Sequence, residues 1–196
     1  MILHGWEMLP EDRLPDIGGW SSQFRALGAR TLQAAGRILQ ELPYGRLDTG
    51  RTYRDVLRDG RGTCSTKHAV LAEVAAEAQV GALLTVGIYD MCETNTPGVG
   101  AILAVAGLPS IPEAHCYVII DGERIDITSR RARARYDIGE LHDEFVVEPP
   151  DVATHKEPVH RKVLRHWIDA HPELLAGRDE EAVWAIREQC IEALAE

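Results

Sequence analysis

Hydrophobic residues recur at helical spacing in two parts of the chain. Between residues 21 and 42, apolar side chains return every three or four positions, which predicts one amphipathic helix that ends at Pro43. The same spacing, in an alanine-rich stretch, predicts a second helix that begins at Thr63 or Cys64 and runs to about Gln79. The second helix therefore starts at or beside a cysteine.

A β-hairpin is the clearest local signal in the sequence. Two β-rich runs in HCYVIIDGERIDITS flank the dipeptide Asp121-Gly122, which is a preferred two-residue hairpin turn. The turn fixes the register, so His115 and Asp126 fall on the same face as diagonal neighbours. Diagonal neighbours lie roughly 7–8 Å apart at the backbone, so an imidazole and a carboxylate can meet there. The apolar run over residues 81–89 predicts another, buried strand.

The chain of 196 residues has the length of a single domain. Residues 1–20 show no clear period and predict an irregular arm, and residues 21–150 form the core. Residues 151–196 are a helical extension, in which 151–158 is predicted to be a linker before two amphipathic helices. The predicted class is therefore α+β, with extra helices at the C-terminal end.

Composition limits the partners. Hydrophobic residues make up 45% of the chain and charged residues 27%, as is usual for a globular protein. The net charge of −10 argues against binding to a phosphate backbone. No apolar run approaches the roughly 18 residues of a membrane span, and the first residues lack a signal-peptide pattern. We therefore expect a cytoplasmic protein with no nucleic-acid or membrane partner.

One of the four cysteines stands out by its position. None is part of a CxxC pair, so free thiols are expected at Cys64, Cys92, Cys116 and Cys190. Cys64 opens a helix, where unpaired N–H groups and a partial positive charge lower the pKa of a thiol. Cys64 is thus the cysteine whose local sequence favours a reactive thiolate.

The hairpin supplies the two groups that such a thiol needs. His115 begins a strand after a proline-rich loop, where it can act as a base and then as an acid. Asp126 stands inside the apolar run RIDIT, which is unfavourable for a carboxylate unless it is paired. His115 is the partner that the register provides. We therefore predict a triad in which Cys64 is the nucleophile, His115 the base and Asp126 the group that orients it.

These residues resemble the transglutaminase-like core of the papain-like cysteine enzymes. A glycine-x-cysteine opens an alanine-rich helix, a histidine begins a strand, and an aspartate on the next strand is closely followed by threonine. The match covers residues 62–128, about a third of the chain. It implies a nucleophile helix packed on an antiparallel sheet. It also implies a cysteine-dependent hydrolase or acyl-transfer enzyme that acts on a peptide or small amide through a thioester, without a cofactor or metal.

The sequence departs from the family pattern at several positions. Tyr117 stands where the family often has tryptophan, and Ile127 follows the aspartate where proline is common. No glutamine lies shortly upstream of Cys64 to serve as a second oxyanion donor. The candidates for oxyanion or substrate contacts are Tyr53, Gly62, Thr63 and Tyr117.

Two alternative functions stay open. The missing glutamine motivates a catalytically inactive, transglutaminase-like binding module. The RG-x-C pattern is similar to that of the arylamine N-acetyltransferases, which motivates an acetyl-CoA-dependent N-acyltransferase. A zinc site is disfavoured: Cys64 and His68 share a helical face, but the chain has no tight ligand pairs.

Overall fold

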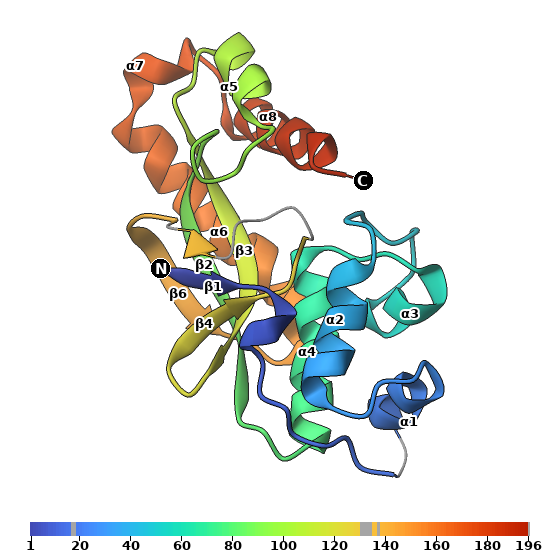
Figure 1. Cartoon of the computed structure of the whole chain (residues 1–196). Coiled ribbons are helices and arrows are strands. Elements are labelled where there is room, and N and C mark those ends of the chain that lie inside the picture. The colour runs from blue at the N-terminus through green and yellow to red at the C-terminus, as the bar shows by residue number, and fades with distance from the viewer. Residues whose placement is uncertain (17–18, 130–134, 137, 196) are drawn as a thin grey trace.

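The computed structural model describes residues 1–16, 19–129, 135, 136 and 138–195 of the chain, and in this part the protein is mixed α and β (Figure 1). Six strands form one sheet in the order β5-β1-β4-β3-β2-β6. The strands are β1 (Ile2–His4), β2 (Ala82–Met91), β3 (Ile111–Ile120), β4 (Glu123–Asp126), β5 (Arg135–Tyr136) and β6 (Leu141–Val146). The α-helices are α1 (Gly19–Ala26), α2 (Leu32–Glu41), α3 (Val56–Asp59), α4 (Cys64–Glu77), α5 (Gly100–Ala106), α6 (Val152–Ala170), α7 (Pro172–Leu175) and α8 (Glu180–Ala193). The short 3-10 helices are η1 (Trp6–Met8), η2 (Tyr53–Asp55) and η3 (Pro149–Asp151).

The predicted hairpin register is confirmed. β3 and β4 are antiparallel, and Ile120 pairs with Glu123 across the turn. Asp121 and Gly122 have φ values of 51° and 82°, and positive φ at both positions is what this type of turn requires. β3 also pairs along its whole length with the predicted buried strand β2. The hairpin thus lies inside the sheet, which holds its ends in place.

The N-terminal residues differ from the prediction of an irregular arm. Residues 2–4 form β1, which runs parallel to β4, so the sheet is mixed rather than antiparallel. His4 stands opposite Asp126 in this pairing. Three residues are too few for a pattern to reveal a strand, and the fully buried Ile2 is what holds the segment in the core. The strand brings a histidine from the start of the chain to the predicted site.

The single helix predicted over residues 21–42 is wrong, because α1 and α2 are separate. Gly28 has a φ of 91°, which ends α1, and the Thr31 side chain accepts the N–H of Ala34 to cap α2. The second predicted helix is confirmed as α4, with Thr63 as its N-cap. α4 packs on β2 and β3, with Ala114, Cys116 and Val118 of β3 in the same core. Figure 1 shows α1 to α4 together on one flank of the sheet.

The predicted linker over residues 151–158 is also wrong, because these residues begin the long helix α6. Pro158 lies inside this helix and removes one backbone hydrogen bond. The buried residues Val152, His160 and Leu164 recur at helical spacing. Val152 belongs to the same core as α4, and Leu164 to a separate buried cluster with Ile111 of β3. This packing outweighs the cost of the proline. α5, α7 and α8 lie together beyond one end of β2 and β3 (Figure 1).

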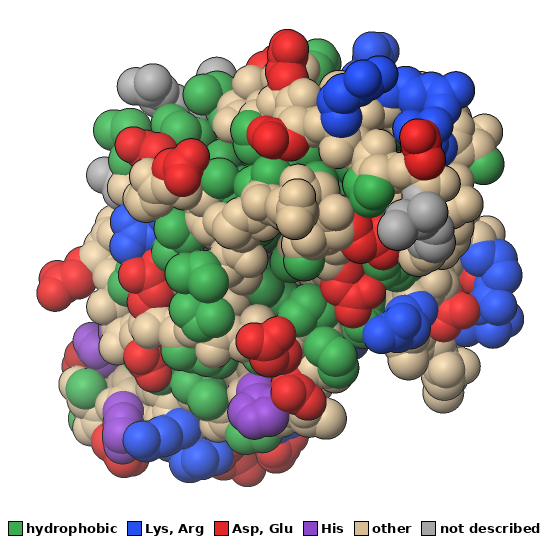
Figure 2. Space-filling model, turned by 90° about the horizontal axis from the view of Figure 1, so that it is seen from below, with side chains coloured by type: hydrophobic (Ala, Val, Ile, Leu, Met, Phe, Trp, Pro, Cys, Tyr) green, Lys and Arg blue, Asp and Glu red, His purple; other side chains and the backbone are tan. Residues whose placement is uncertain are grey.

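The surface mixes the two signs of charge. On the face seen in Figure 2, acidic and basic side chains lie beside one another, with hydrophobic side chains between them. The net charge of −10 is therefore not gathered into one acidic region on that face. None of the helices in the described part of the chain has the length and hydropathy to cross a bilayer.

Candidate active site

Cys64 is the first residue of α4. The Thr63 side chain accepts the N–H of Thr66, and Thr63 in turn donates its N–H to Thr66 Oγ1 at 2.9 Å, which completes a capping box. Among the described residues, no acceptor lies against the N–H groups of Cys64 and Ser65. Two unpaired N–H groups therefore accompany the thiol at the positive end of the helix dipole.

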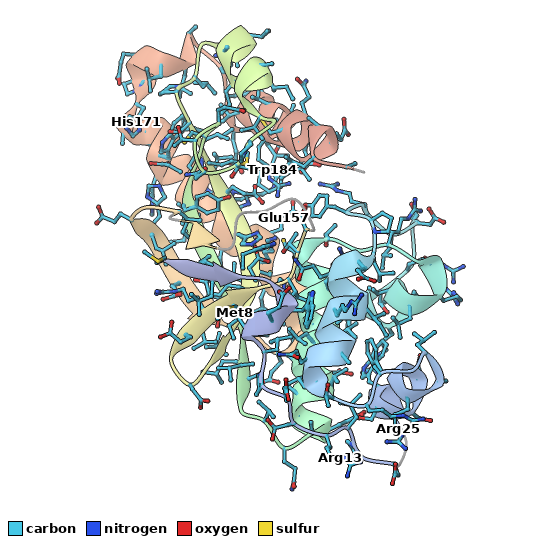
Figure 3. The ribbon with its side chains drawn as sticks, viewed as in Figure 1. Met8, Arg13, Arg25, Glu157, His171 and Trp184 are labelled. Carbon is cyan, nitrogen blue, oxygen red and sulfur yellow. The ribbon has the colours of Figure 1, made fainter. Side chains whose placement is uncertain are left out.

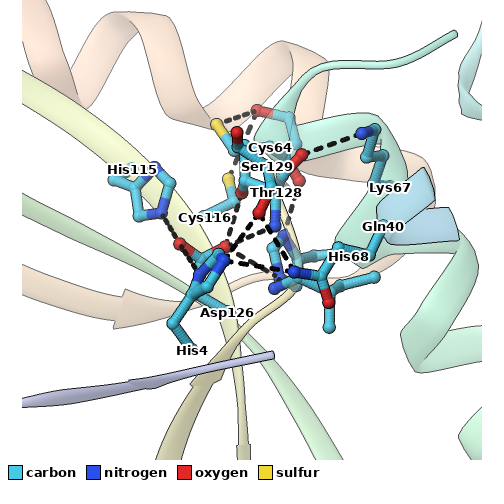
Figure 4. A network of polar contacts seen from close by, with 12 residues as sticks. His4, Gln40, Cys64, Lys67, His68, His115, Cys116, Asp126, Thr128 and Ser129 are labelled. Atoms are coloured by element: carbon cyan, nitrogen blue, oxygen red, sulfur yellow. Dashed lines mark hydrogen bonds and ion pairs between the residues drawn. The ribbon is translucent and has the colours of Figure 1, made fainter. Parts of the chain in front are cut away.

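His115 and Asp126 lie together, as the register predicts. Nε2 of His115 lies 3.1 Å from Oδ2 of Asp126, and 14% of the His115 side chain is exposed against 3% for Asp126 (Figure 4). His115 also makes a side-chain hydrogen bond with Cys64. Because Asp126 occupies Nε2, the nitrogen that remains for the thiol is Nδ1. The three predicted residues thus form one connected chain of contacts.

Asp126 is the centre of a larger polar network (Figure 4). Thr128 donates both its backbone N–H, at 2.8 Å, and its hydroxyl, at 2.5 Å, to Oδ1 of the carboxylate. His4 Nδ1 lies 3.6 Å from Oδ2, and His68 Nε2 lies 3.4 Å from Oδ1. Burial favours the neutral carboxyl, but the charge and hydrogen bond of His115, and the hydrogen bond with His4, lower the pKa of Asp126 well below its usual value. Asp126 is therefore a buried anion that fixes the ring of His115.

His68 ties the helix to the strand. Its Nδ1 lies 2.8 Å from the carbonyl oxygen of Cys64, and its Nε2 accepts the N–H of Ile127 at 2.9 Å. Since Nε2 accepts, Nδ1 carries the proton and the ring is neutral. Burial is the main cause of the lowered pKa of His68, and the lowered pKa keeps the ring neutral. Both ring nitrogens are thereby used, so His68 holds Cys64 beside Asp126.

Three further side chains surround the thiol. Ser65 Oγ lies 3.9 Å from Cys64 Sγ and 3.3 Å from Cys116 Sγ. Lys156, from α6, places Nζ 3.6 Å from Cys64 Sγ and 3.1 Å from Ser65 Oγ. Helix α6 therefore brings a cation to a thiol that stands 92 residues earlier in the chain.

The surroundings of Cys64 and His115 favour the charged form of each side chain. A hydrogen bond from Cys116 lowers the pKa of Cys64 most; burial opposes it, but the Lys156 charge and His115 add to it, and the pKa falls well below its usual value. Burial disfavours a charged His115, yet Asp126 and the Cys64 thiolate outweigh it and raise the pKa of His115 to about 10. At neutral pH the site thus holds a thiolate beside an imidazolium.

Of the four candidates for oxyanion or substrate contacts, two adjoin Cys64 in the chain and two donate to glutamates on other parts of the fold. The Tyr53 hydroxyl donates to Glu73, which is about 13 Å further along α4, so it is not at the thiol. The Tyr117 hydroxyl donates to Glu144 on β6. Gly62 and Thr63 do adjoin Cys64: a Cβ on Gly62 would lie 2.8 Å from Thr66 Oγ1, and Thr63 is engaged in its cap. None of the four directs a free side-chain donor at Cys64.

The sequence interpretation missed several residues that border the site. Lys156 was missed because it lies in the segment that was predicted to be a linker. It shares a helical face with Val152 and His160, and this four-residue spacing is the signal that could have placed it on a helix. Tyr44 was missed in the preceding loop; burial, and then the charge of Cys64, raise its pKa well above the usual value. His4 was missed because nothing in a three-residue strand announces its pairing.

Fold and site together define a mixed α and β protein with a buried cluster of thiolate, imidazolium and carboxylate. Comparison with known proteins gives no match: no protein-family model, no curated protein and no solved structure is significantly similar to the chain. Among the described residues, no group of three or more His, Cys, Asp or Glu side chains is arranged to hold a metal ion.

Proposed function

We propose that this protein is a cysteine-dependent hydrolase or acyl-transfer enzyme of the transglutaminase-like, papain-like type, which acts on an amide or peptide bond. The observation that carries the proposal is the position of His115. Its Nε2 lies 3.1 Å from a buried Asp126 carboxylate, and its other nitrogen is left for the Cys64 thiol at a helix N-terminus. This is the arrangement of nucleophile, base and orienting group that thiol catalysis uses.

In the first half of the reaction, the Cys64 thiolate attacks the carbonyl carbon of the amide and a C–S bond forms. The carbonyl oxygen becomes an oxyanion. His115, which is protonated because its pKa is about 10, donates its proton to the departing nitrogen as the C–N bond breaks. The products are an amine and a thioester on Cys64.

In the second half, neutral His115 removes a proton from water or from an acceptor amine. The oxygen or nitrogen attacks the thioester carbon, and the C–S bond breaks. Cys64 leaves as a thiolate, and His115 keeps the proton, so the resting ion pair is restored. Asp126 stays ionised throughout, because the surrounding histidines hold its pKa low, and it stabilises the imidazolium at each step.

Selective alkylation tests the proposal. Iodoacetamide at mildly acidic pH is expected to label Cys64 well ahead of Cys116 and Cys190, whose pKa values are raised, and ahead of Cys92. His115→Ala is expected to slow the labelling of Cys64, and Cys64→Ala to remove it. Peptide mass spectrometry locates the label. Equal, slow labelling of all four cysteines would contradict the proposal.

Acylation separates the proposal from its alternatives. An activated ester such as p-nitrophenyl acetate should give a burst of p-nitrophenolate and an acetyl adduct on Cys64, which water then removes. An adduct that forms from acetyl-CoA and passes to an arylamine would support the acyltransferase instead. Binding of amides without any Cys64 adduct would support the inactive module.

A further inference from the structure

We propose that Lys156 is a catalytic residue whose ammonium group donates to the oxyanion when Cys64 attacks a carbonyl. The inference rests on the proposed function and supplies the second oxyanion donor that the sequence leaves unassigned. Its basis is the position of Nζ, 3.6 Å from Cys64 Sγ and 3.1 Å from Ser65 Oγ. An oxygen on the carbon bonded to Sγ falls within reach of a group at that distance.

The ammonium has a donor to spare. It carries three N–H groups, and its contacts among the described residues use two of them, toward Cys64 Sγ and Ser65 Oγ. In the attack, negative charge moves from sulfur to oxygen. The ammonium lies 3.6 Å from the large sulfur atom, whereas an oxyanion accepts a charged N–H at about 2.7–2.9 Å, so the two charges come closer together in the adduct. Lys156 therefore interacts more strongly with the tetrahedral adduct than with the resting thiolate, which is the condition for catalysis.

Contacts of helix α6 with β3 and α8 hold Lys156 in position. His160, one turn after Lys156 on the same face, lies with Nε2 2.8 Å from the carbonyl oxygen of Pro112 on β3. The His160 ring also packs against Trp184 of α8, with 4.9 Å between ring centroids. Trp184 is labelled in Figure 3. Because His115 stands on β3 too, one strand positions both the base and the helix that carries Lys156.

The surrounding charges keep Lys156 protonated. Burial opposes its charge, but Cys64, Cys116 and Glu113 together raise the pKa of Lys156. Glu113 is itself held as an anion by Arg187, whose Nε and Nη2 lie 2.5 and 2.7 Å from the two carboxylate oxygens. When acylation removes the thiolate charge, the oxyanion becomes the anion that Lys156 faces.

Two reagents that attack the same sulfur test the role of Lys156. Ester acylation passes through an oxyanion, whereas iodoacetamide alkylates by displacing iodide and forms none. Both rates are measured on the full chain, in the pH plateau where Cys64 is fully ionised, so that a change in thiol pKa does not enter. Lys156→Met is expected to lower the rate of acylation by p-nitrophenyl acetate roughly 100- to 1,000-fold. The same variant should change the alkylation rate by no more than about threefold, because alkylation needs no oxyanion donor.

Two further variants complete the experiment. Lys162→Met, an exposed position on the same helix, should leave both rates unchanged. Lys156→Leu, which also has no hydrogen-bond donor, replaces Lys156→Met if circular dichroism shows that the methionine variant does not fold. Equal effects on both rates, or no effect on acylation, would overturn the role of Lys156 while the proposed function stands. Absence of any Cys64 acyl adduct in the unsubstituted protein would overturn the proposed function and this inference with it.

Discussion

The imidazole of His68 accepts the backbone N–H of Ile127 at 2.9 Å, and this one contact joins the first turn of α4 to the end of β4. The helix carries the Cys64 thiol, and the strand carries the Asp126 carboxylate one residue before Ile127. His68 is fully buried, so water does not compete for the bond. The distance between thiol and carboxylate is therefore set by a rigid link within the core.

Cys116 is expected to control the pH at which Cys64 becomes reactive. The hydrogen bond from Cys116 is the largest cause of the lowered pKa of Cys64. Cys116→Ala removes the donor, so the midpoint of the plot of Cys64 alkylation rate against pH should move to higher pH. Cys116→Ser keeps an O–H donor and should leave the midpoint lower than alanine does. Identical midpoints for the two variants would show that a hydrogen bond from position 116 does not lower the pKa of Cys64.

Removing the Asp126 charge is expected to cost stability in a pH-dependent way. Asp126→Asn breaks a buried pair and should lower the free energy of unfolding by about 3–5 kcal/mol at pH 7. The folded pKa of Asp126 is lowered, so its contribution is present above the unfolded value of about 3.9 and is lost as pH falls below it. Urea unfolding should thus show the two proteins converging in acid. The control is Asp90→Asn. The exposed Asp90 carboxylate lies 2.9 Å from His142, and its loss should lower the free energy of unfolding by less than about 1 kcal/mol. A difference between Asp126→Asn and the unsubstituted protein that stays constant across the acid range would contradict the prediction.

Gly62 is expected to be essential for the position of the nucleophile. A Cβ there would lie 2.8 Å from Thr66 Oγ1 and 3.1 Å from Lys67 Cγ, so Gly62→Ala must shift the Thr66 side chain, which is part of the cap of α4. We expect a loss of about 1–3 kcal/mol in the free energy of unfolding, and slower alkylation of Cys64. Gly45→Ala, where the nearest atom is Arg61 Cδ at 3.7 Å, is the matched control. If both alanine variants alkylate at the same rate, the close approach at Gly62 does not position the thiol.

The buried pair of Glu113 and Arg187 is expected to behave non-additively. Arg187→Met leaves Glu113, of which only 6% of the side chain is exposed, as an unpaired anion and should cost about 3–5 kcal/mol. The double variant Glu113→Leu, Arg187→Met removes both charges and should recover most of that loss. Chemical denaturation of the three proteins gives the coupling. Additive losses would mean that the ion pair does not anchor α8 to β3.

The sequence predicts the pairing of His115 with Asp126, and the helix that Cys64 opens, because a local rule determines each of them. Asp121-Gly122 selects a turn with positive φ at both residues, and that turn sets the β3–β4 register that brings His115 to Asp126. Thr63 caps the helix that Cys64 opens. Both rules act over a few residues, so tertiary context does not override them.

The rest of the site could not be predicted, because it depends on contacts between distant segments. Pro158 argues for a linker, and only the packing of Leu164 and His160 on the core makes the segment helical. Neither Lys156 nor His4 carries a local pattern that says which strand or helix it will meet. The break at Gly28 is different, because the glycine and the capping Thr31 are local signals that predict a helix end and a helix start. The continuous apolar period across them led to the prediction of one helix.

Placing Lys156 so far along the chain also has a consequence for biosynthesis. The ribosome must add 92 residues after Cys64 before this lysine is made. At about 5–20 residues per second, that interval is roughly 5–20 seconds. During it, the emerging thiol has no ammonium beside it. The nascent chain therefore carries an incomplete reactive centre, which closes only when the C-terminal helices have been released and have docked.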